Sequence, residues 1–196
     1  MYILESNSSK KEIVDILTLL KVRCSKFMSK RNSTRVMVVQ FVSTKGPDGI
    51  IDLYRAHIAF GKIISYYAVT SKLDVFHSID MNFEDRNRFI SMNEFLCNKI
   101  LTIEEQILLS AKVLGCNIGA VEFFLTNDEP IFLEFNPMWG GNASKLGFGP
   151  KELRNYLDKN RSTLEKKIPN IYQFTDYQLY YKSLYEGIHE YCQNSS

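Results

Sequence analysis

Three oxygen-bearing side chains lie near one another in two apolar runs of the sequence. Glu122 lies within Gly119-Ala120-Val121-Glu122-Phe123-Phe124, and Glu134 and Asn136 lie within Phe132-Leu133-Glu134-Phe135-Asn136-Pro137. If the runs pair as a hairpin, Glu122 lies across from the second run, where Glu134 and Asn136 point to one side. Neighbouring carboxylates in an apolar setting need a cation, and Mg²⁺ accepts such oxygen ligands while keeping sites for phosphate. The spacing therefore predicts a magnesium site.

The same residues allow a second interpretation without a metal. Glu122 could lie on a solvent-facing side of its strand. Glu134 and Asn136 could then be the polar half of an ordinary alternation before a turn. The spacing alone leaves both interpretations open.

Extended segments must position these side chains. Residues 117–125 and 131–135 form apolar runs joined by a short polar turn, which predicts two paired strands. Residues 50–60 and 62–70 form two further extended runs. Gly61 between them predicts a tight antiparallel hairpin, because glycine adopts the unusual backbone angles of such a turn. Upstream, residues 36–42 are rich in β-branched side chains and predict another strand.

The remaining segments predict helices. Residues 88–114 have helical periodicity, and Thr102 with Glu105 three residues later matches a capping box, so we expect a break near residue 101. Residues 151–192 predict further helices, with Pro150 in the first helical turn and an interruption at residues 168–170. The fold class is therefore α+β: an antiparallel sheet with flanking helices, followed by a helical C-terminal tail.

Composition excludes several classes of protein. Of the 196 residues, 45% are hydrophobic and 23% are charged, which is typical of a soluble globular protein. The net charge of +2 favours neither nucleic acid nor membrane as a partner. A local basic stretch at residues 21–35 is interpreted as a solvated face, because aromatic residues do not interleave with its charges as in single-strand binders.

The spacing of the cysteines and the lack of a long apolar run indicate the cellular compartment of the protein. The four cysteines lie far apart and form no C-x-x-C pair, so we expect free thiols rather than a zinc site or disulfides. No apolar run approaches the ~20 residues that span a bilayer. We therefore expect a cytoplasmic protein.

The two runs around Glu122 and Glu134 resemble the closing signature of the ATP-grasp superfamily, whose members include D-alanine–D-alanine ligase, glutathione synthetase and biotin carboxylase. The resemblance implies that Glu122, Glu134 and Asn136 hold Mg²⁺, or Mn²⁺, that bridges the phosphates of ATP. The family often has an arginine shortly after the asparagine-proline pair. This sequence has Met138-Trp139-Gly140-Gly141 there instead.

Upstream segments resemble other parts of the same family. Residues 38–42 resemble the hinge strand that binds adenine, which implies nucleotide contacts by Gln40, Phe41 and Val42, joined by Leu133. Many members have Gln-Glu in this strand, and the glutamate is absent here.

Two basic residues are implied as catalytic groups. Asp52-Leu53-Tyr54-Arg55 and the following turn resemble the D-x-x-R strand and hairpin of the family, so Arg55 is expected to face the transferring phosphate. An arginine suits this role, because its planar guanidinium grips phosphate oxygens in a bidentate way. Lys72 is a candidate for a second phosphate ligand. Alternatively, Arg55 is a surface residue of its strand.

The resemblance divides the chain into three parts. Residues 1–70 correspond to part of the small ATP-grasp subdomain, residues 71–149 to the C-terminal subdomain with the metal-binding hairpin, and residues 150–196 to a helical tail. The lysines and glycine-rich loop of the family's other wall have no counterpart, since no glycine precedes Gly46. We therefore expect a fragment, a split subunit or a degenerate relative, completed by the missing half or by another chain.

The resemblance implies an ATP-dependent ligase that activates a small-molecule carboxylate as an acyl phosphate for attack by an amine or similar nucleophile. The alternative is a non-catalytic nucleotide-binding or interaction module of the same fold.

Overall fold

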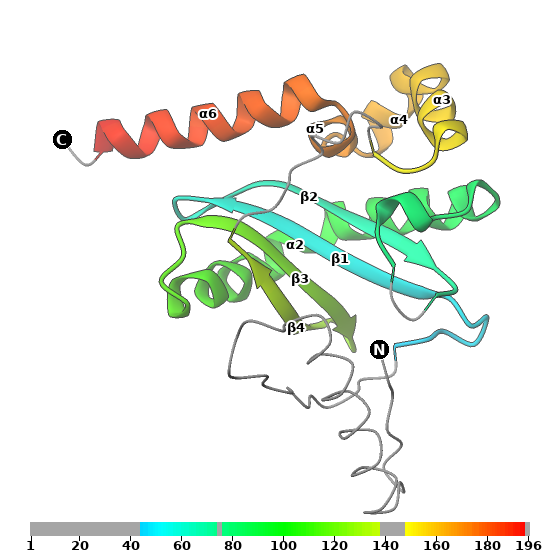
Figure 1. Ribbon diagram of the computed structural model, residues 1–196, viewed down its shortest axis with the longest axis horizontal. Helices are drawn as coiled ribbons and strands as arrows, with labels where there is room; N and C mark the ends of the chain where they lie inside the picture. The colour runs from blue at the N-terminus through cyan, green and yellow to red at the C-terminus, as the bar shows by residue number, and fades with distance from the viewer. Residues whose placement is uncertain (1–43, 74–75, 138–147, 195–196) are drawn as a thin grey trace, which may run out of the picture. The chain divides into compact units, whose positions relative to one another are not determined.

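The centre of the molecule is a four-stranded antiparallel sheet. Its strands are β1 (Ile51–Ala59), β2 (Lys62–Ser71), β3 (Ile118–Thr126) and β4 (Glu129–Asn136), arranged in the order β2-β1-β3-β4 (Figure 1). The computed structural model describes residues 44–73, 76–137 and 148–194. The strand predicted at residues 36–42 lies outside these ranges. Since all four strands share one sheet, the boundary expected at residue 70 falls within it.

Both predicted hairpins are confirmed, and both have two-residue turns with left-handed backbone angles. Phe60 and Gly61 have φ values of 49° and 79°, and Asn127 and Asp128 have φ values of 51° and 68°. Two consecutive positive φ values are typical of the turn whose twist matches that of paired strands. A phenylalanine is unusual in this region, and its ring stacks on Tyr191 at 4.3 Å between centroids.

The helix after the first hairpin is continuous, so the predicted break near residue 101 is wrong. Helix α2 spans Arg86–Val113. The Thr102 hydroxyl donates to the carbonyl oxygen of Lys99 at 2.7 Å, within the helix, instead of capping a new one. Ile100 and Ile103 are both buried on the sheet side, and burial of this apolar stripe outweighs the local capping pattern.

The C-terminal tail is helical, as predicted. It comprises α3 (Lys151–Lys159), α4 (Arg161–Lys167), α5 (Ile171–Thr175) and α6 (Tyr177–Asn194). The expected interruption at residues 168–170 lies between α4 and α5. Pro150 stands one position before α3 as its N-cap rather than within its first turn. The segment between β2 and α2 contains two 3₁₀ turns, η1 (Ser78–Asp80) and η2 (Phe83–Asp85).

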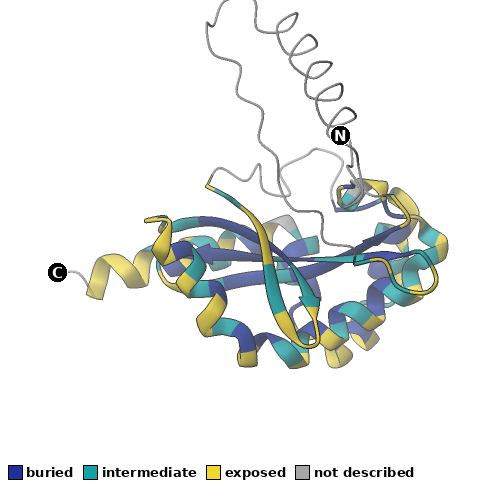
Figure 2. Cartoon of the chain, turned by 90° about the horizontal axis from the view of Figure 1, so that it is seen from below, coloured by how far each residue is buried: buried dark blue, intermediate teal, exposed yellow. Residues whose placement is uncertain are grey.

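The helices cover the two faces of the sheet. Helix α2 crosses one face, where Ala56, Ile58, Val121 and Phe123 pack against its buried side, while the tail helices gather beside β2 (Figure 1). On the other face, the core combines sheet residues with side chains from the tail and its approach: Tyr67, Val69, Phe148, Leu153, Ile171 and Phe174. β4 is much less covered than β1 and β2 (Figure 2).

The backbone groups on the outer edge of β2 are paired with asparagine side chains from α2 and from the residue before α5. Asn93 of α2 accepts a hydrogen bond from the Ala68 backbone N–H at 2.9 Å and donates to the Ala68 carbonyl at 3.0 Å. Asn170 donates to the carbonyl of Tyr66 at 3.1 Å. An edge strand needs such partners because its outward backbone groups otherwise go unpaired when buried.

The glycine at the start of the Gly119-Ala120-Val121-Glu122 run has a packing role. A Cβ at Gly119 would overlap the ring of Phe135 on β4 and lie 2.9 Å from the Asn136 carbonyl oxygen. The missing side chain therefore lets β4 lie against β3 with Phe135 folded across it. This closeness helps hold Glu134 and Asn136 in place.

Replacing Gly119 with alanine should destabilise the fold by about 1–3 kcal/mol, because the ring of Phe135 must move. The matched control is Gly187→Ala in α6, where a new Cβ would meet Ile64 at 3.5 Å, an ordinary contact. That change should raise stability by up to about 1 kcal/mol through helix propensity. Urea unfolding of both variants measures the two effects, and equal behaviour would contradict the role assigned to Gly119.

Candidate functional site

The register of the sheet brings the predicted acids together. Glu122 on β3 is paired with Glu134 on β4, and Arg55 on β1 is paired with Glu122 on its other side. Tyr67 on β2 completes the row as the partner of Arg55. Cross-strand partners lie on the same face of a sheet. We call these four residues the Glu122 row.

Asn136 lies on the same face as the Glu122 row. It is paired with Ala120, two residues before Glu122 on β3. Its side-chain amide donates to the Glu134 carboxylate at 2.7 Å. The prediction that Glu134 and Asn136 point to one side is confirmed, and so is their position across from Glu122.

The environments of the two acids differ from the expectation of a common apolar setting. Glu122 is 9% exposed, whereas Glu134 is exposed to solvent on β4. Glu122 forms an ion pair with the Arg55 guanidinium, whose side chain is 23% exposed. Arg55 is therefore not a free surface residue, because its guanidinium is paired with Glu122. Its charge balances the buried carboxylate.

A β-bulge in β4 places Glu134 on the face of the Glu122 row and Phe132 on the opposite, apolar face of the sheet. The β3–β4 register shifts after Glu122, so Phe132 is paired with Phe123 and Leu133 has no partner opposite it. In a regular strand, Phe132 and Glu134 would point to the same face. The extra residue instead directs Phe132 towards the side of Phe123 and Glu134 towards the side of Glu122.

A small polar cavity lies against the middle of the row. Its volume is about 100 Å³, and its lining comes from β1, β2, β3 and the segment after β2: Leu53, Arg55, Tyr67, Val69, Phe76, His77, Ser78 and Glu122. A water molecule has about 30 Å³ of liquid volume, so this space suits a few waters or an ion rather than a nucleotide.

Tyr67 closes the β2 end of the row. Its ring is buried, and the Arg55 guanidinium carbon lies 6.0 Å from the ring centroid, within the range of a cation–π contact. Burial raises the pKa of the Tyr67 hydroxyl, and the positive charge of Arg55 partly opposes this shift. The phenol therefore stays neutral and holds Arg55 towards Glu122.

His57 is a buried polar residue of this face that the sequence did not single out. It follows Arg55 by two positions, its Nδ1 lies 2.6 Å from the Ser65 hydroxyl, and its ring meets Tyr180 edge-on at 5.2 Å. Burial, and secondarily the charge of Arg55, lower the pKa of His57 to about 3. Its two-residue spacing from Arg55 was the available signal in the sequence.

The other predicted site residues lie apart from the row. Lys72 is exposed just after the end of β2, and Leu133 is 46% exposed at the bulge. Asp52 of the D-x-x-R run turns to the helix side, where both carboxylate oxygens accept from Arg88 at 2.9 Å and 2.7 Å. Gln40, Phe41 and Val42 lie outside the described residues.

Comparison of the chain with models of protein families, with curated proteins and with solved structures finds no match. Within residues 44–73, 76–137 and 148–194, no group of three or more His, Cys, Asp or Glu side chains is placed to hold a metal. The predicted set consists of two carboxylates and an amide. In the same ranges, no helix has the length and hydropathy needed to cross a membrane.

The buried His57 should make stability depend on pH. Its pKa of about 3 in the folded chain lies below the ordinary value of 6.5, so its contribution is complete above about pH 6.5 and declines as pH falls towards 3. Between pH 7 and pH 5, the wild type should lose about 2 kcal/mol more than His57→Gln. Urea unfolding at both pH values checks this. The exposed His77→Gln should behave as the wild type, and equal losses in all three would refute the assignment.

Proposed function

We propose that this chain supplies the metal- and phosphate-binding wall of an ATP-dependent ligase of the ATP-grasp type. The observation that carries the proposal is the alignment of Arg55, Glu122 and Glu134 across three adjacent strands, with Asn136 on the same face. The resemblance of the two sequence runs to the ATP-grasp signature gives this alignment its functional meaning.

The chemistry of the donor set fits Mg²⁺ or Mn²⁺. Two carboxylates and an amide oxygen are hard ligands, and Mg²⁺ uses few protein carboxylates while leaving positions for phosphate oxygens. Glu122 is buried beside a small polar cavity, and Glu134 is open to solvent, so a cation could approach from the β4 side. When bound, the metal would neutralise charge on the phosphates of ATP.

Arg55 has two roles in this proposal. Its guanidinium neutralises Glu122, which would otherwise be a buried charge without compensation. If Glu122 held a cation, the Arg55 guanidinium would be free to bind another anion beside the same cavity. Its planar group can then take two oxygens of the transferring phosphate. The buried, neutral Tyr67 keeps it near the row in both states.

The reaction proposed is activation of a small-molecule carboxylate. A carboxylate oxygen attacks the γ-phosphorus of ATP, and the bond from that phosphorus to the oxygen of ADP breaks. An amine or similar nucleophile then attacks the acyl carbon, and phosphate leaves. Gln40, Phe41, Val42 and Leu133 are proposed to contact the nucleotide, and Lys72 is proposed as an additional phosphate ligand. The remaining wall is proposed to come from an upstream half or another chain.

Calorimetric titration of the chain with ADP in the presence of Mg²⁺ tests the proposal. Glu134→Ala should weaken metal-dependent binding at least tenfold, the effect of losing one ligand. The control is Glu129→Ala, which removes an exposed acid from the same strand outside the row. Binding that is unaffected by Glu134→Ala, or equally weakened by both changes, would contradict the site.

A second candidate function is a non-catalytic module that keeps the fold without turnover. The ion pair of Arg55 with Glu122 favours it, because the buried acid already has a neutralising partner. Glu134→Gln separates the two functions. In a non-catalytic module this change should leave thermal stability with Mg²⁺ and ADP unchanged or raised. In a working site it should abolish the stabilisation that Mg²⁺ and ADP give the wild type.

A further inference from the structure

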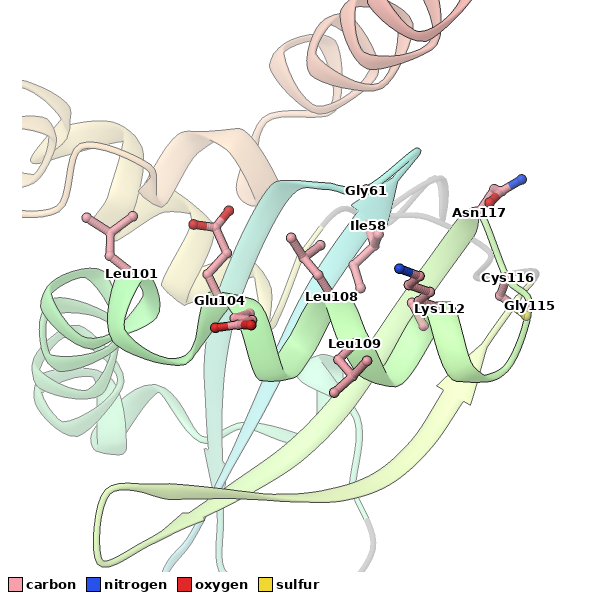
Figure 3. Close-up of a pocket in the computed structure, with 12 residues that line it drawn as sticks. Ile58, Gly61, Leu101, Glu104, Leu108, Leu109, Lys112, Gly115, Cys116 and Asn117 are labelled. Carbon is pink, nitrogen blue, oxygen red and sulfur yellow. The ribbon is translucent and has the colours of Figure 1, made fainter. Parts of the chain in front are cut away.

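A second cavity lies on the helix side of the sheet, away from the Glu122 row. Its volume is about 680 Å³, and it is a groove lined by the C-terminal half of α2, the β1–β2 hairpin and the loop that leads into β3 (Figure 3). The lining includes Ile58 and Gly61 of the hairpin and Gly115 and Cys116 of the loop. Nothing in the proposed ligase chemistry uses this groove.

The groove is bordered by leucines whose side chains are exposed instead of buried in the core. Leu101 is 77% exposed and Leu109 is 54% exposed, although the opposite side of the same helix is buried against the sheet. Exposed apolar side chains gathered along a groove mark a surface that another molecule covers.

Two of the three charged residues that line the groove lie symmetrically about Leu108. Glu104 and Lys112 lie four residues before and four residues after Leu108, so all three fall on one side of α2 (Figure 3). Within the part of the chain that the structure describes, neither Glu104 nor Lys112 forms an ion pair. A two-fold axis through Leu108, perpendicular to α2, exchanges the positions of the two charges.

We propose that the occupant of this groove is a second copy of the chain, docked with its α2 antiparallel to the first α2. With the axis at Leu108, Glu104 of each copy meets Lys112 of the other, which gives two ion pairs. Leu101 lies seven residues before the axis and therefore meets the other copy seven residues after it, at Gly115. The small residue there, beside Ile58 and Gly61, leaves room for the leucine.

The self-complementary charges favour a second copy over an unrelated partner. A groove for a basic or an acidic peptide would carry charge of one sign along its length. This groove is acidic at Glu104 and Glu105 and basic about two helical turns later at Lys112. An identical helix running the other way matches both ends with the same side chains.

Sedimentation of the full chain over a wide range of concentration tests the proposal. The wild type should associate to a dimer. Glu104→Lys and Lys112→Glu should each weaken association at least tenfold, because each places two pairs of like charges in contact. The double variant Glu104→Lys/Lys112→Glu should restore it. A wild-type chain that stays monomeric, or a double variant no better than the single ones, would overturn the proposal.

Disulfide trapping locates the contact independently of charge. Leu101→Cys should form, under mild oxidation, an intermolecular disulfide with Cys116 of the other copy, since Cys116 is a free thiol at the groove. The control is Val113→Cys, equally exposed at 76% but outside the groove lining. Peptide mapping should find the 101–116 link and lose it with Cys116→Ser. Equal trapping by both variants would refute the two-fold arrangement.

Discussion

The antiparallel pairing of β1 with β3 determines almost everything else in the structure. These strands are separated in sequence by β2 and the whole of α2, yet they are neighbours at the centre of the sheet. Their register places Arg55 beside Glu122 on one face and Ala56 beside Val121 on the other. If β1 slipped by one residue against β3, Arg55 would face α2, and apolar residues such as Ala56 would face the side of Glu122. The apolar contacts with α2 and the ion pair therefore favour the same register.

The bulge in the β3–β4 pairing lets the outer strand β4 place apolar side chains on one face of the sheet and Glu134 on the other. Phe132 and Phe135 must cover the apolar side next to Phe123, while Glu134 must stand beside Glu122. Regular alternation cannot satisfy all of these at once. One unpaired residue, Leu133, reverses the alternation between them. Gly119 then allows Phe135 to cross β3 closely, so the geometry of the polar side depends on packing of the apolar side.

The sequence predicted both hairpins, the helical tail and the position of Glu134 and Asn136 across from Glu122, because these follow from local alternation and turn chemistry. It did not predict the bulge or the pairing of Arg55 with Glu122, since both depend on contacts between strands far apart in sequence. The capping pattern at Thr102 was misleading because burial of Ile100 and Ile103 continues the helix through it. The proposals for Gln40, Phe41 and Val42 concern residues outside the described ranges.

The dependence of the sheet on its last helices bears on the order in which the chain can fold as it is synthesised. The first hairpin can form as soon as residue 71 is made, because its contacts are local. Its two apolar faces are then covered by α2 on one side and, much later, by Phe174 and Tyr180 on the other. Until the tail emerges, the face that bears Tyr67 and Val69 is open to water and to other nascent chains. Synthesis through Tyr180 of α6 is therefore a condition for a closed core, and a chain that stops within α5 should leave this face open to chaperones and proteases.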